Sequence, residues 1–196
     1  MKPLRGHRTQ MSFDLLRADL ERQYSLEGKI QKATCWQMIK RLPSPRFLPL
    51  VLCRYSRTAL LRGVPGLPYI LSYLNLILFG LHVTPKCEIG PGLFFPHTMG
   101  TVLGAWKLGS NVTVFQNVTL GAKIIDMAFD RTLLPIIGDN VTIGAGAKVL
   151  GGIVLGNNVT VGSNAVVVHS IEANCTVVGV PARKITPAKH IELGSD

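Results

Sequence analysis

An aliphatic residue recurs at every sixth position through the second half of the chain. The series comprises Ile137, Ile143, Val149, Leu155, Val161 and Val167, and the same spacing occurs upstream at Val102, Leu108, Val114 and Leu120. A period of six matches neither the roughly 3.6 residues of an α-helical turn nor the alternation of a simple strand. A fixed repeat of this kind decides the architecture of the whole segment.

Each six-residue unit can supply one short strand and one turn, and three units can close a triangular coil of about 18 residues. The aliphatic residue then points into the prism and stacks on its equivalent in the next coil. Asn-Val-Thr triplets begin at positions 111, 117, 140 and 158. Asn tolerates the left-handed backbone of a corner, while Val and Thr suit a strand. One coil cannot bury a core alone, so the sequence predicts about four stacked coils.

The segment 1–83 carries a different pattern, in which apolar residues fall at helical spacing. Helices are expected after Ser12 and over 29–42, 47–61 and 69–83, and the last segment has no charged residue. That segment is too short to span a bilayer comfortably, so it is expected to be a buried or interfacial helix. The predicted organisation is a helical region (1–83), a coil domain (84–185) with an inserted loop at 122–135, and a C-terminal tail (186–196).

Four motifs in the coil domain resemble those of the hexapeptide-repeat acyltransferases and, more narrowly, the serine acetyltransferases. They are IGPGLFFPHTMGTVLG at 89–104, VTLG at 118–121, IGAGAKVLG at 143–151 and VGVPAR at 178–183. The resemblance implies an α+β chain whose coil domain is a left-handed parallel β-helix. It also implies acetyl transfer from acetyl-CoA to a hydroxyl group without a metal. The family pattern further implies a homotrimer with active sites between subunits; the short helical region favours a trimer over a hexamer.

The same resemblance assigns roles to particular residues. His97 matches the general base of the family, and histidine suits that role because it titrates near neutrality. Arg131 and His82 match positions that would face the acceptor. Small residues would let acetyl-CoA approach the backbone closely. The positions matched to cofactor binding are Gly121, Ala122, Ala145, Ser163 and Arg183.

Three motif positions depart from the serine-specific pattern. Pro96 replaces the aspartate that precedes the catalytic histidine, His82 replaces a second aspartate, and the histidine that follows Arg131 in the family is missing. A serine zwitterion needs a carboxylate near its ammonium group, so these changes predict weakened amino-acid recognition. The sequence therefore predicts a sugar hydroxyl of an exopolysaccharide or capsule precursor as acceptor, as in the exopolysaccharide-associated members.

L-Serine is the alternative acceptor, because Arg131 and most motifs are kept and because Asp126 or Asp130 could replace a lost carboxylate. A non-catalytic coil, or a metal enzyme of the γ-carbonic-anhydrase type, fits less well. His97 and His169 lack metal-ligand spacing, and the four cysteines form neither a CxxC pair nor a His/Cys cluster. No metal is therefore expected.

The net charge of +10 is unevenly distributed, with 13 Lys and Arg against four Asp and Glu in residues 1–70. Such asymmetry suits an anionic membrane surface, an acidic partner or simply solvated helix faces. No nucleic-acid-binding motif and no secretory signal peptide are visible. The expectation is a cytoplasmic enzyme, alternatively one that contacts the inner face of the membrane through its N-terminal region.

Overall fold

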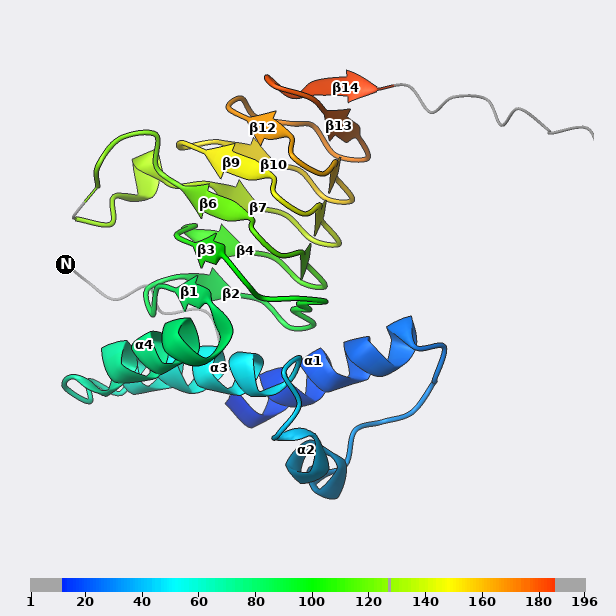
Figure 1. Ribbon diagram of the computed structural model, residues 1–196, viewed down its shortest axis with the longest axis vertical. Coiled ribbons are helices and arrows are strands. Elements are labelled where there is room, and N and C mark those ends of the chain that lie inside the picture. Colours follow the sequence, from blue (N-terminus) through cyan, green and yellow to red (C-terminus); the bar gives the residue numbers. More distant parts are fainter. Residues whose placement is uncertain (1–11, 127, 186–196) are drawn as a thin grey trace, which may run out of the picture.

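The computed structural model describes residues 12–126 and 128–185, and it places four helices at one end of a stack of short strands (Figure 1). The C-terminal tail expected at 186–196 lies outside the described residues, as do the first 11 residues. The helices are α1 (Ser12–Leu26), α2 (Cys35–Arg41), α3 (Leu48–Leu61) and α4 (Leu67–Phe79). All four helices precede the strands along the chain.

Two helix boundaries differ from the prediction, each for a local reason. The helix α2 begins only at Cys35, because the Thr34 side chain accepts a hydrogen bond from the Gln37 backbone and the Gln37 side chain accepts one from the Thr34 backbone. The helix α4 ends at Phe79, because Gly80 adopts a left-handed φ of 61°. Residues 81–83, predicted to be helical, form a strand instead, so the first coil begins at Leu81 rather than at position 84.

The helix α4 is not buried as a whole. Its buried residues are Pro68, Ser72 and Asn75. The Ser72 hydroxyl donates to the Val83 carbonyl at 2.6 Å, and the Asn75 amide donates to the Pro49 carbonyl at 3.0 Å. Polar side chains therefore attach α4 to the first coil and to α3, while most of its large apolar side chains stay exposed.

Three sheets form the sides of the coil stack. The first contains β1-β3-β6-β9-β12, the second β2-β4-β7-β10 and the third β5-β8-β11-β13-β14. The strands are β1 (Leu81–Val83), β2 (Glu88–Ile89), β3 (Thr101–Leu103), β4 (Lys107–Leu108), β5 (Thr113–Val114), β6 (Thr119–Gly121), β7 (Ile136–Ile137), β8 (Thr142–Ile143), β9 (Lys148–Leu150), β10 (Val154–Leu155), β11 (Thr160–Val161), β12 (Val166–Val167), β13 (Thr176–Val178) and β14 (Arg183–Ile185). Strands pair in parallel between coils, and β14 folds back antiparallel onto β13.

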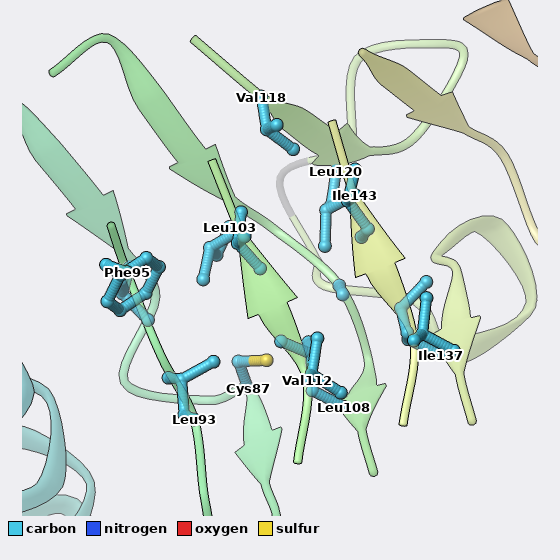
Figure 2. Packing of buried hydrophobic residues seen from close by; sticks show 14 of the residues in the cluster. Cys87, Leu93, Phe95, Leu103, Leu108, Val112, Val118, Leu120, Ile137 and Ile143 are labelled. Atoms are coloured by element: carbon cyan, nitrogen blue, oxygen red, sulfur yellow. The ribbon is translucent and has the colours of Figure 1, made fainter. Parts of the chain in front are cut away.

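The aliphatic series fills the interior of the prism as predicted, with one exception. Leu108, Val114, Leu120 and the six later members of the series are at most 1% exposed. Figure 2 shows Leu108, Leu120, Ile137 and Ile143 packed in the coil interior. Val102 is the exception at 37% exposure, because the spacing shifts after Phe95 and Leu103 points inward instead.

Stacked asparagines form the corner between the second and third sheets. Asn111, Asn140, Asn158 and Asn174 all adopt a positive φ between 56° and 59°. Their amide groups form a ladder in which each Nδ2 donates to the Oδ1 of the next, at 3.2, 3.2 and 2.8 Å. The ladder gives hydrogen-bond partners to the amide groups of the asparagines that the left-handed corners require.

Replacing Asn140 with alanine is expected to lower the free energy of unfolding by about 2 kcal/mol, because a β-carbon disfavours this backbone and two amide hydrogen bonds are lost. Asn140→Gly should lose only about half as much, since glycine accepts a positive φ freely. Urea denaturation of both variants gives the comparison. Equal losses in the two variants would show that backbone strain plays no part at this corner.

A buried ion pair joins the helices to the first coil. Asp19 of α1 is fully buried and Arg54 of α3 is 4% exposed. Arg54 Nε and Nη2 donate to the two Asp19 carboxylate oxygens at 2.9 and 2.8 Å. Arg54 also donates to the carbonyls of Ile89 and Gly90 at 2.6 and 2.7 Å, and Asp19 accepts from Leu93 N–H at 2.9 Å. The pair therefore fixes the coil segment that leads to His97.

Candidate active site

His97 lies at the corner where the first coil passes from the third sheet into β3 of the first sheet. On its N-terminal side, Phe95 is fully buried in the prism. On its C-terminal side, the Thr98 hydroxyl donates to the Phe79 carbonyl at 2.8 Å, and Thr101 N–H donates to the Gly80 carbonyl at 3.2 Å. The exposed imidazole is thus carried on a backbone fixed at both ends.

This corner is wider than the other corners on the same edge. In the first two coils, Phe94 pairs with Thr113 before the corner and Val102 pairs with Thr119 after it. The segment from Phe94 to Val102 is longer than its partner, Thr113 to Thr119, by two residues. The six-residue period is therefore interrupted at the corner that carries His97.

Equivalent positions in four successive coils form a column along this edge. Counted forward from the third sheet, the pairing register matches His97 with Gln116, Ala145 and Ser163. Counted back from the first sheet, it matches Met99 with the same three residues, because the first corner has two extra residues. We call the set that begins at His97 the His97 column. Backbone hydrogen bonds connect its corners, because Asn117, Gly146 and Asn164 donate their N–H groups to the carbonyls of Met99, Gln116 and Ala145 at 2.9, 3.0 and 2.8 Å. Three residues that the sequence proposed for the site, His97, Ala145 and Ser163, therefore share one edge of the molecule.

The His97 column also contains Gln116, which was not among the site residues predicted from the sequence. Its alignment with Ala145, at the corner one coil along from His97, is the signal that could have found it once the chain is divided into coils. The residue lies in a repeat unit that matches the general pattern, so its polar side chain looked like an ordinary corner residue.

His82 lies at the outward position of β1. It lines a hollow of about 480 Å³ between α4 and the first coil, together with Tyr69, Ile70, Tyr73 and Leu76. The wall of this hollow is mainly apolar. Within the described residues, no side-chain hydrogen bond joins His82 to His97.

Gly121 and Ala122 lie at the opposite edge of the first sheet from the His97 column. A β-carbon built on Gly121 would meet no atom within 4 Å, whereas one on Gly144 would lie 2.7 Å from the Ser163 nitrogen. Contact between coils therefore explains the glycine at 144 but not the one at 121. The open surface at Gly121 fits a position where a ligand approaches the backbone.

Arg131 belongs to the inserted loop, which folds against the second sheet. The loop places the Phe129 ring 5.6 Å from the Trp106 ring, and the Arg131 guanidinium lies 5.8 Å from the Trp106 ring centroid. Lys86 lies over the Phe129 ring at 5.6 Å. A cavity of about 330 Å³ lies beneath this cluster. Arg131 is thus held by an aromatic stack on another face of the chain from His97.

The two carboxylates of the inserted loop are engaged within the loop. Asp126 accepts hydrogen bonds from the backbone N–H groups of Ala128 and Asp130 at 3.0 and 2.7 Å. Asp130 caps the short 3-10 turn (Arg131–Leu133) through the backbone and hydroxyl of Thr132, and these hydrogen bonds lower the pKa of Asp130. Both groups therefore organise the loop in the single chain. Arg183 is exposed on β14, at the far end of the stack.

No three His, Cys, Asp or Glu side chains gather in the arrangement of a metal site within residues 12–126 and 128–185. Among the helices that the structure describes, none has the length and apolar character needed to cross a bilayer. Three of the cysteines, Cys53, Cys87 and Cys175, are buried, and Cys35 is exposed. Burial raises the pKa of the Cys53 and Cys87 thiols to about 12.

Native protein is therefore expected to show one fast-reacting thiol, at Cys35, towards an aromatic disulfide reagent at pH 8. At that pH only about one in 10⁴ of the Cys53 and Cys87 groups is a thiolate, and raising the pH to 9 leaves the fraction small. All four thiols should react in denaturant. Two or more fast thiols in the native protein would contradict the buried placement.

Comparison with known proteins adds direct evidence of relationship. Residues 135–169 match the family described as bacterial transferase hexapeptide (six repeats). A serine acetyltransferase of Helicobacter pylori is 35% identical over 173 residues, which cover 85% of this chain and 98% of the relative. A serine acetyltransferase of Synechococcus elongatus is 37% identical over 157 residues, but the match spans only 63% of that longer relative.

Solved structures agree with these sequence relatives. Neisseria gonorrhoeae serine acetyltransferase in complex with serine matches with a TM-score of 0.74 and 31% identity, over 88% of this chain and 68% of that chain. A serine acetyltransferase in complex with CoA matches with a TM-score of 0.75 and 26% identity, over 89% and 69%. These neighbours support the N-terminal helices and the left-handed sense of the β-helix that the resemblance implied.

The relatives overturn the predicted acceptor. That prediction, a sugar hydroxyl in exopolysaccharide or capsule synthesis, rested on Pro96, on His82 and on the missing histidine after Arg131. The relatives and structures found are serine acetyltransferases, so the exopolysaccharide-associated assignment is wrong and the alternative acceptor is the better supported one. The three substitutions change individual side chains, whereas the similarity extends over most of the chain and over nearly the full length of one relative. The chain belongs to the serine acetyltransferase family of hexapeptide-repeat transferases.

Proposed function

We propose that this protein is an acetyl-CoA-dependent serine O-acetyltransferase, with His97 as its general base. The observation that carries the acyl-transfer part is the His97 column, in which an exposed histidine stands at the head of a row that includes Ala145 and Ser163. The similarity to serine acetyltransferases carries the choice of L-serine. Acetyl-CoA would lie along this row, with Gly121 and Ala122 offering a second open backbone surface.

The reaction proceeds by direct attack. His97 accepts the proton of the serine hydroxyl while its oxygen forms a bond to the thioester carbon. The C–S bond then breaks, and the proton passes from His97 to the departing sulfur, so that O-acetylserine and CoA are the products. Because the acceptor attacks the thioester itself, no serine or cysteine nucleophile of the protein is required.

The distribution of the other candidate residues favours a site between subunits. In one chain Arg131 belongs to the inserted loop, against the second sheet, and Gly121 lies at the edge of the first sheet opposite the His97 column. A neighbouring copy can bring such faces together in a closed ring, as the resemblance to trimeric enzymes suggests. Arg131 of one copy would then meet the serine carboxylate near His97 of another. Membrane contact plays no part in this reaction and is not proposed.

Purified protein in detergent-free buffer is expected to scatter light as a particle with three times the chain mass of 21.3 kDa. The reason is that a site shared between subunits requires the subunits to stay together at the concentration of the assay. A stable monomer at micromolar concentration would remove the basis for such a site.

The test of the proposed activity is release of free thiol from acetyl-CoA, followed with and without L-serine. The proposal expects release that depends on serine and saturates with it. Homoserine and glycerol serve as hydroxyl controls, because one lengthens the amino acid and the other lacks both charges. Binding of acetyl-CoA without serine-dependent thiol release would contradict the choice of acceptor.

A further inference from the structure

Gln116 lies at the corner one coil further along from the corner that carries His97, and the neighbouring Asn117 N–H donates to the Met99 carbonyl at 2.9 Å. The side-chain Oε1 of Gln116 is buried and has no hydrogen-bond partner within the described residues 12–126 and 128–185. The Nε2 of the same group is not buried and makes no hydrogen bond in this part of the chain, so it is open to solvent. The carboxamide therefore presents its N–H groups outward, at the corner next to the one that carries His97.

The fold gives no reason of its own for an amide at this position. The corner asparagines at 111, 140, 158 and 174 bond to one another in a ladder. The later positions of the His97 column are the small residues Ala145 and Ser163. Leaving a buried carbonyl without a partner costs stability, so a polar side chain kept here points to a use other than folding.

We propose that Gln116 is a further catalytic residue, which donates a hydrogen bond from Nε2 to the acetyl carbonyl oxygen of acetyl-CoA. The inference rests on the proposed function, because that function places the thioester beside His97. As the serine oxygen bonds to the thioester carbon, the carbonyl oxygen gains a negative charge, which it loses when the C–S bond breaks. A fixed side-chain amide donor stabilises such an oxyanion.

The distance between neighbouring coils suits a site in which His97 and Gln116 contact different oxygens. Neighbouring coils lie about 4.8 Å apart. Side chains from adjacent coils can therefore reach two oxygens bonded to one carbon: His97 reaches the attacking serine oxygen, and Gln116 reaches the carbonyl oxygen. The proton moves between serine, His97 and sulfur, and Gln116 keeps its own protons throughout.

The test compares Gln116→Glu and Gln116→Met with the wild-type protein in the serine-dependent thiol-release assay. Glu keeps the size and polarity of the side chain but removes the donor, and Met keeps only the length. Both variants are expected to lower kcat by about 10²–10³-fold, while KM for acetyl-CoA rises by no more than about threefold. Asn158→Gly, which removes an amide from another corner, should keep the wild-type kcat.

A kcat within threefold of wild type in either Gln116 variant would overturn the proposal. A separate titration distinguishes failure of the proposed function. If the wild-type protein releases no thiol with serine, the acceptor is wrong. The role of Gln116 is then tested by calorimetry, which compares the affinities for acetyl-CoA and CoA. The proposal requires the wild-type protein to bind acetyl-CoA more tightly than CoA and Gln116→Met to lose that difference; equal affinities in the wild-type protein would also overturn it.

Discussion

Replacing His97 with alanine is expected to lower kcat for serine-dependent thiol release by about 10²–10⁴-fold, because the serine hydroxyl loses the group that accepts its proton. The imidazole is exposed and packs into no core, so the variant should keep the thermal stability and the oligomeric mass of the wild-type protein. Steady-state kinetics over a range of serine and acetyl-CoA concentrations measures the effect. KM for acetyl-CoA is expected to change little.

The matched control is His169→Ala, which removes another exposed histidine from the same coil stack. Its kcat should equal that of the wild-type protein. An unchanged rate in His97→Ala would remove His97 from the mechanism, whereas an equal loss in both variants would indicate a general effect on the β-helix.

Replacing Asp19 with alanine is expected to lower the free energy of unfolding by about 3–5 kcal/mol. The change leaves Arg54 as a buried charge without its carboxylate and leaves the Leu93 N–H without its acceptor. Such a loss is a large part of the roughly 5–15 kcal/mol that stabilises an ordinary domain. Urea denaturation followed by circular dichroism gives the measurement.

Arg57→Ala is the control for Asp19→Ala. Arg57 also lies on α3 and also donates to coil carbonyls, those of Pro85 and Lys86, but at the edge of the structure. Its loss should cost no more than about 1 kcal/mol. If the two variants unfold at the same urea concentration, the buried pair is not what holds the helices to the first coil.

The fold was largely predictable because the interior of the prism repeats in the sequence. Once Ile137 and its successors are known to point inward, the stacking follows from the period alone. The errors lie where a single residue overrides the pattern. Gly80 ends α4, so that Leu81–Val83 can join the first sheet as a strand. The two extra residues at the His97 corner shift the register, so that Leu103 points inward and Val102 points outward.

The site was predictable only in part, because its residues are joined by stacking rather than by sequence neighbourhood. His97, Ala145 and Ser163 carried family motifs and could be proposed from them. Gln116 carried no such mark. Its buried carbonyl, which has no hydrogen-bond partner in the part of the chain that the structure describes, is visible only in three dimensions. The acceptor was predicted wrongly because Pro96 and His82 were taken to mean that serine is no longer recognised. Another face of the chain, or another copy, can supply an interaction that one side chain no longer makes.

Because the coils are evenly spaced, the number of coils in the His97 column fixes the distance that a bound ligand must span. From His97 to Ser163 the column climbs three coils, which at about 4.8 Å per coil amounts to about 14 Å. A ligand whose thioester lies at His97 can therefore contact Ser163 only if the rest of the molecule extends about 14 Å along the column. Adding or removing a whole coil would change this reach in steps of about 4.8 Å without changing any corner. The repeat that builds the core thus also sets how long a cofactor must be to contact both ends of the column.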